Sequence, residues 1–155
     1  PNTDIGSLIS EEAAVQVEQR VQDAVAQGAK LVCGGERNGA QYSPTVLDHV
    51  DRNCELVRQE TFGPCAPIIR IQDIQDAIEC VNDTEFGLQT GIFSDSLKDV
   101  RLAAKKLKVG AVAFNDGPQF ESYNIPFGGV KKSGLGREGL PYAIEEMTTL
   151  KTIVF

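Results

Sequence analysis

The sequence predicts an α/β fold with a mostly parallel sheet and flanking helices. Residues 14–25 carry apolar side chains at helical spacing and, after Gly28, lead into a short β-prone run, 30–33. A second β-prone run, 65–71, is followed by the helical pattern of residues 74–81. Alternation of extended and helical segments is typical of βαβ units, whose strands pair in parallel.

The first helix has the clearest sequence signals. Ser10 is the predicted N-cap, and Gly28 is the predicted stop. Between them one apolar stripe is formed by Ala14, Val17, Val21, Ala24 and Val25. Residues 36–44 resemble a loop, and residues 44–50 suit a strand or an extended segment.

The second half of the chain continues the alternation. An extended run is expected at 87–93, followed by a helix that is capped by Ser94 or Asp95 and has apolar positions from 97 to 107. A buried strand is expected at 111–114, before a glycine-rich stretch. The last elements expected are a helix with apolar positions from 140 to 147 and a final strand at 148–155. No repeat, low-complexity tract or linker divides the sequence, so one structural unit is expected.

Composition excludes several classes of partner. The 155 residues carry a formal net charge of -7, which argues against a nucleic-acid partner, because such binding needs clustered lysine and arginine. No apolar run reaches the ~18–20 residues that would cross a bilayer, and residues 1–6 lack the features of a signal peptide. The expectation is a cytoplasmic protein with no membrane partner.

The cysteines and the single histidine indicate no metal site. Four cysteines are widely spaced without a Cys-x-x-Cys pair, and His49 has no ligand pattern around it. Buried, unreactive thiols are expected at Cys33, Cys65 and Cys80, and also at Cys54. None of the four is assigned a catalytic role.

A glycine pattern, Gly134-x-Gly136-x-x-Gly139, matches the dinucleotide-binding fingerprint only in its letters. That fingerprint needs a strand directly before it and a second strand after its helix. No strand is predicted directly before Gly134, and the sequence ends before a second strand with its ribose-binding acid could appear, so the pattern is interpreted as a chance match.

Three ordered motifs resemble the aldehyde dehydrogenase superfamily. Residues 59–64 are similar to its Glu-x-Phe-Gly-Pro motif, and residues 82–88 to its Asn-Asp-x-x-Tyr-Gly-Leu segment, with Phe86 in place of tyrosine. Residues 126–139 are similar to its C-terminal signature. The resemblance covers the whole chain and implies the catalytic-domain fold of that family. Since residues 4–9 resemble the stretch after the reactive cysteine, the chain is expected to be a C-terminal portion that lacks the nucleophile, the general-base glutamate and the cofactor-binding domain.

The resemblance also implies roles for individual residues. Glu60 matches the glutamate that accepts hydrogen bonds from the nicotinamide ribose, and Phe62 matches an aromatic beside the nicotinamide. Phe127 matches a residue that lines the aldehyde tunnel. Residues 116–124 match the variable segment at the substrate entrance, where Phe120 and Tyr123 are weaker candidates than Phe127. Taken alone, Glu60 would also suit an exposed loop, and the aromatic residues would suit ordinary packing.

The implied function is that of an oxidoreductase. The parent protein would use NAD or NADP to oxidise an aldehyde to a carboxylic acid, and the isolated chain would be inactive. Similarity of residues 123–139 to lactaldehyde, phosphonoacetaldehyde and non-phosphorylating glyceraldehyde-phosphate dehydrogenases suggests a small polar aldehyde. Residues 1–147 would form the later part of the catalytic domain. Residues 148–155 would form a strand that contacts another subunit of a homo-oligomer. A non-catalytic assembly or binding module and a CoA-acylating relative are the alternatives.

Overall fold

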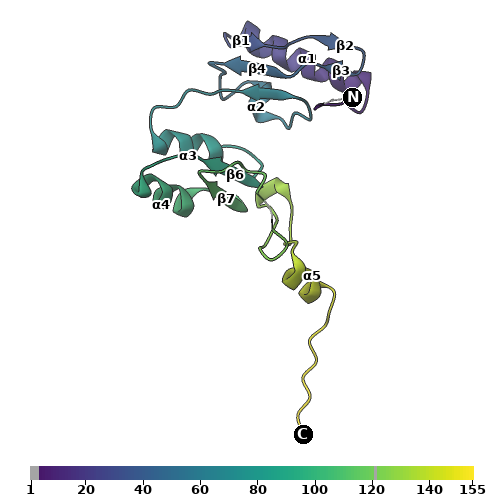
Figure 1. Cartoon of the computed structure of the whole chain (residues 1–155), viewed down its shortest axis with the longest axis vertical. Coiled ribbons are helices and arrows are strands. Elements are labelled where there is room, and N and C mark those ends of the chain that lie inside the picture. Colours follow the sequence, from purple (N-terminus) through teal and green to yellow (C-terminus); the bar gives the residue numbers. More distant parts are fainter. Residues whose placement is uncertain (1–3, 121) are drawn as a thin grey trace. The chain divides into compact units, whose positions relative to one another are not determined.

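The structure is a computed structural model that describes residues 4–120 and 122–155. Its contacts divide the chain into two compact units, residues 1–71 and residues 72–155 (Figure 1). The sequence was expected to form one structural unit, because no linker-like composition marks this boundary. The proposed division at residues 147 and 148 stays a prediction.

Unit 1 is built around α1 (Glu11–Ala26), which begins where the sequence predicts. The Ser10 hydroxyl oxygen accepts a hydrogen bond from the Ala13 amide at 3.2 Å, so Ser10 is the N-cap. Four residues of the predicted stripe are buried, namely Ala14, Val17, Val21 and Ala24. Val25 is exposed, so the buried face is one residue narrower than predicted.

The sheet of unit 1 is mixed, which corrects the expectation of a mostly parallel sheet. Its order is β1 (Lys30–Cys33), β4 (Thr45–Asp48) and β5 (Cys65–Pro67). The pair β1–β4 is antiparallel and the pair β4–β5 is parallel. The short α2 (Glu55–Arg58) lies in the connection from β4 to β5, whereas no helix separates β1 from β4, and parallel pairing needs a long crossover.

A hairpin occupies the region that was predicted to be a loop. It consists of β2 (Arg37–Asn38) and β3 (Gln41–Tyr42). Strands of two residues show no periodicity in a sequence, which is why the pattern missed them. Tertiary contacts stabilise the hairpin instead: Arg37 pairs with Glu18 of α1 at 2.8 Å, and the side chain of Tyr42 is buried.

Burial of the cysteines differs from the expectation. Cys33 is exposed because every residue of β1, the edge strand, is exposed. Cys54 is buried, while Cys65 and Cys80 are partly buried. The core of unit 1 also contains apolar residues from α1, α2, β3 and β4 and their flanks, which are Val17, Val21, Ala24, Ala29, Tyr42, Leu47, Val50 and Leu56.

Unit 2 contains a parallel pair of strands linked by a helix, as predicted. Strands β6 (Gln89–Ile92) and β7 (Ala111–Phe114) pair with Gln89 opposite Ala111, and α4 (Leu97–Lys106) connects them. The helix α3 (Ile74–Asn82) contacts α4. Strand β7 is only partly buried, not buried as expected.

The N-cap of α4 is Ser96, which corrects the prediction of Ser94 or Asp95. The Ser96 hydroxyl oxygen accepts from the Asp99 amide at 3.3 Å. The Ser94 hydroxyl oxygen instead accepts from the Ser96 amide at 3.1 Å. Three possible caps occur within three residues, and only the backbone conformation distinguishes them.

The carboxyl-terminal region is less regular than predicted. A 3-10 turn (Lys131–Ser133) and α5 (Leu140–Glu146) are present, but residues 148–155 form no strand (Figure 1). A β-strand requires backbone hydrogen bonds to a neighbouring strand, and no segment within residues 4–120 or 122–155 supplies them. Within the same residues, no helix is long and apolar enough to cross a membrane.

Asp48 gives unit 1 a pH-dependent contribution to stability. Arg70 donates to both of its oxygens, with Nε at 2.9 Å from Oδ1, and His49 Nδ1 lies 3.3 Å from Oδ2. The hydrogen bonds from Arg70 lower the pKa of Asp48 from 3.8 to about 2. A lowered folded-state pKa stabilises the fold above the unfolded pKa, and this contribution is lost as the pH falls from about 4 to about 2.

We therefore expect Asp48→Asn to reduce the denaturant midpoint at pH 7 and to have little effect near pH 2. Asp95→Asn, which changes an exposed carboxylate, is the control. Chemical unfolding at a series of pH values measures both. An Asp48→Asn deficit that is equally large at pH 7 and pH 2 would show that ionisation of Asp48 does not stabilise the fold.

Candidate functional site

The predicted site residues belong to two different units. Glu60 and Phe62 belong to residues 59–64 of unit 1, which we call the EF loop. Phe120 and Phe127 belong to unit 2. The geometry of each pair is described within its own unit.

Helix α1 holds the first part of the EF loop through Arg20. Its Nη1 donates to the Glu60 carbonyl oxygen at 2.7 Å and to Thr61 Oγ1 at 3.0 Å. Its Nε also donates to the Glu55 carboxylate at 3.3 Å. Nothing in the motif itself identified Arg20, which precedes the loop by 40 residues.

The second part of the EF loop packs closely on α1 and β4. A Cβ on Gly63 would lie 2.7 Å from Val17 Cγ2, so a larger residue would force the loop away from the helix. The Pro64 carbonyl oxygen accepts from the Thr45 amide of β4 at 2.8 Å. The glycine and proline of the motif thus lie where the loop meets the core.

The side chains of Glu60 and Phe62 are free to meet a ligand. Glu60 is exposed, and its carboxylate has no protein partner in the described part of the chain. Phe62 is 81% exposed and lines an open groove of about 900 Å³ with residues 5–9 and 61–64. A carboxylate that can accept two hydroxyl groups beside an exposed aromatic face suits a ribose and its attached ring.

Phe120 and Phe127 line one cavity in unit 2. The cavity has a volume of about 160 Å³ and lies against β6 and β7. Phe127 is partly buried and Phe120 is more than half exposed. Other walls come from Ala111, Val112, Ala113, Pro118, Ile125 and Pro126, with polar groups at Gln89, Thr90 and Ser122. Tyr123 is exposed and does not line this cavity.

The main chain of Phe127 is fixed by the following signature residues. Phe127 and Glu138 exchange two backbone hydrogen bonds, at 3.0 Å and 2.6 Å. Arg137 Nη1 donates to the carbonyl oxygens of Gly129 at 2.8 Å and Gly136 at 2.6 Å. The signature therefore folds back on itself and orients Phe127.

The segment at residues 82–88 contacts the C-terminal signature at residues 126–139, mainly through Gly87. The Gly87 amide donates to Ser133 Oγ at 2.9 Å, and its carbonyl oxygen accepts from the Val130 amide at 2.9 Å. A Cβ on Gly87 would lie 2.5 Å from the Lys108 carbonyl oxygen and 2.9 Å from Val130 Cγ2. The two motifs recognised separately in the sequence thus form one structure.

Asn82 and Lys131 complete this support, and the sequence patterns did not assign them roles. The Asn82 side chain accepts from the Lys108 amide at 2.7 Å and donates to the Lys106 carbonyl oxygen at 2.9 Å, so it joins α3 to the end of α4. Lys131 Nζ donates to the carbonyl oxygens of Asn82 and Thr84 at 2.9 and 3.0 Å. The only feature of the sequence that pointed to Asn82 and Lys131 was their place within the recognised motifs.

The glycine pattern 134–139 does not have the setting of a dinucleotide fingerprint. A 3-10 turn precedes Gly134, and α5 begins at Leu140 with no strand between them. All three glycines have positive φ angles, which agrees with a series of turns.

Burial shields the thiol of Cys54 and, in part, that of Cys65. Burial raises the pKa of the Cys65 thiol to about 11, so it is protonated at neutral pH. Cys54, the N-cap residue of α2, is buried. In the part of the chain that the structure describes, no cluster of histidine, cysteine, aspartate and glutamate could hold a metal ion.

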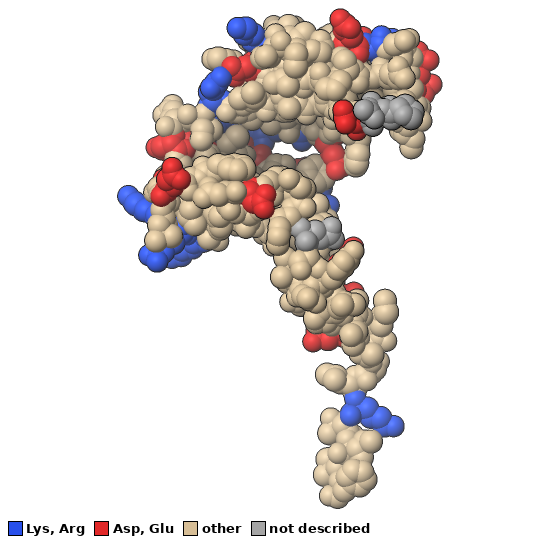
Figure 2. All heavy atoms as spheres, in the orientation of Figure 1, with Lys and Arg blue, Asp and Glu red and all other residues tan. Residues whose placement is uncertain are grey.

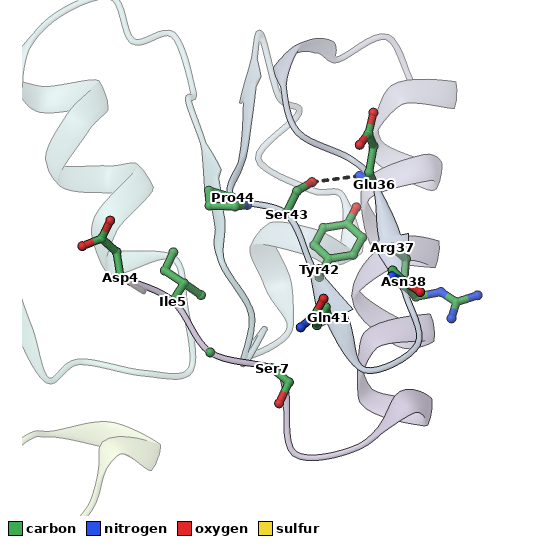
Figure 3. A pocket seen from close by; sticks show the side chains of 11 residues that line it. Asp4, Ile5, Ser7, Glu36, Arg37, Asn38, Gln41, Tyr42, Ser43 and Pro44 are labelled. Carbon is green, nitrogen blue, oxygen red and sulfur yellow. Dashed lines mark hydrogen bonds between the residues drawn. The ribbon is translucent and has the colours of Figure 1, made fainter. Parts of the chain in front are cut away.

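A further cavity in unit 1 contains none of the predicted site residues. Its volume is about 570 Å³, and residues 4–7 line one side while residues 36–38 and 41–44 line the other (Figure 3). Two of the lining residues are joined by a hydrogen bond, which the Glu36 amide donates to Ser43 Oγ at 2.9 Å (Figure 3).

Charge is distributed without a large basic area on the face shown in Figure 2. Lysine and arginine side chains there form small groups among acidic ones. This distribution agrees with the net charge of -7 and does not resemble a phosphate-binding surface.

Two curated relatives are similar to nearly all of this chain. The lactaldehyde dehydrogenase of Methanococcus maripaludis is 42% identical over 153 residues, which cover 99% of this chain and 33% of the relative. The 3-sulfolactaldehyde dehydrogenase of Priestia megaterium is 45% identical over 152 residues, which cover 98% of this chain and 32% of the relative.

Solved structures of two dehydrogenases are also similar to nearly all of this chain. A glyceraldehyde-3-phosphate dehydrogenase from Methanocaldococcus jannaschii, complexed with NADP, matches with a TM-score of 0.90 and 48% identity over 97% of this chain and 33% of that one. A betaine aldehyde dehydrogenase from Staphylococcus aureus, in complex with NAD+, matches with a TM-score of 0.83 and 34% identity over 93% of this chain and 30% of that one.

The chain spans about one third of the length of the curated relatives it matches. These shares give the extent of the match, and they do not confirm the expected C-terminal position within a longer protein. The α/β fold of the aldehyde dehydrogenases is confirmed by the structural matches. The profile of the aldehyde dehydrogenase family matches residues 1–153, and the chain therefore belongs to that family.

Proposed function

We propose that this chain is one segment of an NAD(P)-dependent aldehyde dehydrogenase that oxidises a small polar aldehyde to a carboxylic acid. The observation that carries the proposal is that Phe120 and Phe127, separated by seven positions, line a single cavity beside β6 and β7. The relatives named for lactaldehyde and 3-sulfolactaldehyde support a short, polar substrate.

The unit 2 cavity suits such a substrate in size and lining. A volume of about 160 Å³ admits only a few non-hydrogen atoms. The aromatic and aliphatic walls would exclude water, while Gln89, Thr90 and Ser122 offer hydrogen-bonding groups. Phe127 would form the inner wall and Phe120 the more exposed one.

The EF loop would bind the cofactor. When bound, NAD or NADP supplies the hydride acceptor for aldehyde oxidation. The Glu60 carboxylate would accept hydrogen bonds from the two ribose hydroxyls, and the exposed face of Phe62 would pack beside the nicotinamide. Arg20, Val17 and Thr45 would keep the loop in place from within unit 1.

The catalytic nucleophile would come from another part of the parent protein. The Cys65 thiol is protonated at neutral pH because burial raises its pKa to about 11, Cys54 is buried, and Cys33 lies on the exposed edge strand. The isolated chain would therefore be inactive. A cytoplasmic location stays a prediction.

We expect the full-length protein to reduce NAD or NADP when it is supplied with short polar aldehydes, and Glu60→Gln to weaken this activity. Loss of the charged acceptor should raise the KM for the cofactor about tenfold, because hydrogen bonds to charged groups are the stronger ones. Absorbance of the reduced cofactor measures turnover, and Glu36→Gln, an exposed glutamate of the same unit, is the control.

Three outcomes distinguish the proposal from the CoA-acylating relative and the assembly module, and a fourth tests whether the chain lacks the nucleophile. Oxidation to the free acid without CoA supports the proposal, whereas a strict requirement for CoA would favour the acylating relative. No turnover with any aldehyde, together with no cofactor binding, would favour the assembly module. Turnover by the isolated 155-residue chain would contradict the claim that it lacks the nucleophile.

We also propose that residues 148–155 pair with another subunit of a homo-oligomer. The segment pairs with no strand among the described residues of its own chain, and its apolar side chains Leu150, Ile153, Val154 and Phe155 are exposed. Unpaired β-prone backbone with exposed apolar side chains favours pairing with a second chain.

Replacing Ile153 and Phe155 together with aspartate should lower the oligomeric state of the full-length protein, because two charges would be placed in the proposed contact. Light scattering coupled to size exclusion measures the mass of the particle. Val32→Asp, at an exposed apolar position of β1, is the control. An unchanged mass for the double variant would exclude this segment as the contact.

A further inference from the structure

We infer that Arg20 of α1 is a positioning residue for cofactor binding: it fixes the main chain of the EF loop so that Glu60 and Phe62 face the ligand. This inference rests on the proposed function of Glu60. It assigns a role to a side chain outside the three recognised motifs, on a helix that otherwise serves the core.

The geometry around Arg20 is that of an anchor. One guanidinium nitrogen, Nη1, reaches both the Glu60 carbonyl oxygen and Thr61 Oγ1, at 2.7 and 3.0 Å. The Nε atom of the same planar group reaches Glu55 at the start of α2, at 3.3 Å. The Arg20 side chain is 21% exposed, and its planar guanidinium presents several donors in fixed directions.

The EF loop needs such an anchor because its functional side chains are not held by burial. Glu60 and Phe62 both project into solvent, so packing does not fix their direction. Their orientation is set by the main chain from which they extend. A binding group that is ordered before the ligand arrives loses less entropy on binding.

Two other contacts fix only the far end of the loop. Gly63 packs against Val17, and the Pro64 carbonyl oxygen accepts from the Thr45 amide. At the near end, the Gln59 amide donates to the Glu55 carbonyl oxygen at the end of α2. Arg20 is the side chain that binds Glu60 and Thr61 between these points, so its removal should loosen these two residues without unfolding unit 1.

The experiment compares Arg20→Gln with Arg37→Gln in the full-length protein. Arg37 is a comparable control because it too makes three hydrogen bonds, two to the carboxylates of Glu18 and Glu11 and one to the Gly39 carbonyl oxygen, and is similarly exposed. None of its partners lies in the EF loop. Equal losses of thermal stability would show that the two variants are equally perturbed.

Two readouts are needed. Hydrogen exchange without cofactor should show residues 60–63 exchanging about tenfold faster in Arg20→Gln and unchanged in Arg37→Gln. The Kd for NAD or NADP, from quenching or calorimetry, should rise about tenfold in Arg20→Gln alone. The KM for the cofactor should rise more than kcat falls, because the loop would bind the cofactor and not perform the chemical step.

A milder variant covers the case in which Arg20→Gln does not fold. Thr61→Val removes one acceptor and leaves the arginine in place, so smaller changes in the same direction are expected. If Arg20→Gln folds, the double variant with Thr61→Val should show less than the sum of the two effects, since both remove the same contact.

The outcomes separate this inference from the proposed function. If the unaltered protein binds neither NAD nor NADP, the proposed function fails. If the unaltered protein binds the cofactor and Glu60→Gln weakens binding, while Arg20→Gln and Arg37→Gln behave alike, only the role of Arg20 is overturned. Faster exchange in Arg20→Gln with an unchanged Kd would also overturn it.

Discussion

Each candidate site segment is positioned by a glycine whose backbone lies so close to neighbouring atoms that a Cβ would not fit. In unit 1, Gly63 brings the EF loop against Val17 of α1. In unit 2, Gly87 lies against the Lys108 carbonyl oxygen and Val130 while it exchanges hydrogen bonds with the signature. A methyl group at either position would displace the segment that carries the aromatic residue, because interiors are close-packed.

The two segments share a further property: their functional side chains extend from a main chain that is held by hydrogen bonds. Glu60 and Phe62 extend from a loop whose carbonyl oxygens are bound by Arg20 and Thr45. Phe127 extends from a turn that is closed by Glu138 and Arg137. Binding groups on a firmly held main chain meet a ligand with little reorganisation, which favours affinity. This arrangement agrees with sites for a cofactor and a small substrate.

Local signals predicted the helices well and the sheets poorly. Apolar spacing and a cap fixed α1 to within a residue, and the same signals located α3, α4 and α5. Strand direction was less predictable, because it depends on how the chain returns between strands. The connection from β1 to β4 contains a hairpin of two-residue strands, which no periodic pattern marks, and the sheet is mixed as a result. Phe120 and Phe127 line one cavity, and their roles stay predictions from the resemblance. The supporting residue Arg20 has no sequence pattern of its own, and only its place in a recognised motif pointed to Asn82.

The sequence by itself determined the helices other than α2, most of the extended runs, the family and the candidate residues, because spacing and ordered motifs are properties of the chain alone. The tertiary structure decided which of those residues meet. It placed Arg20 against Glu60 across 40 positions and Ser133 against Gly87 across 46, and it left Cys33 exposed on an edge strand. It also left residues 148–155 without a strand, since a strand exists only where a second segment accepts and donates its hydrogen bonds. Long-range hydrogen bonds and burial depend on packing in three dimensions, which a one-dimensional pattern does not contain.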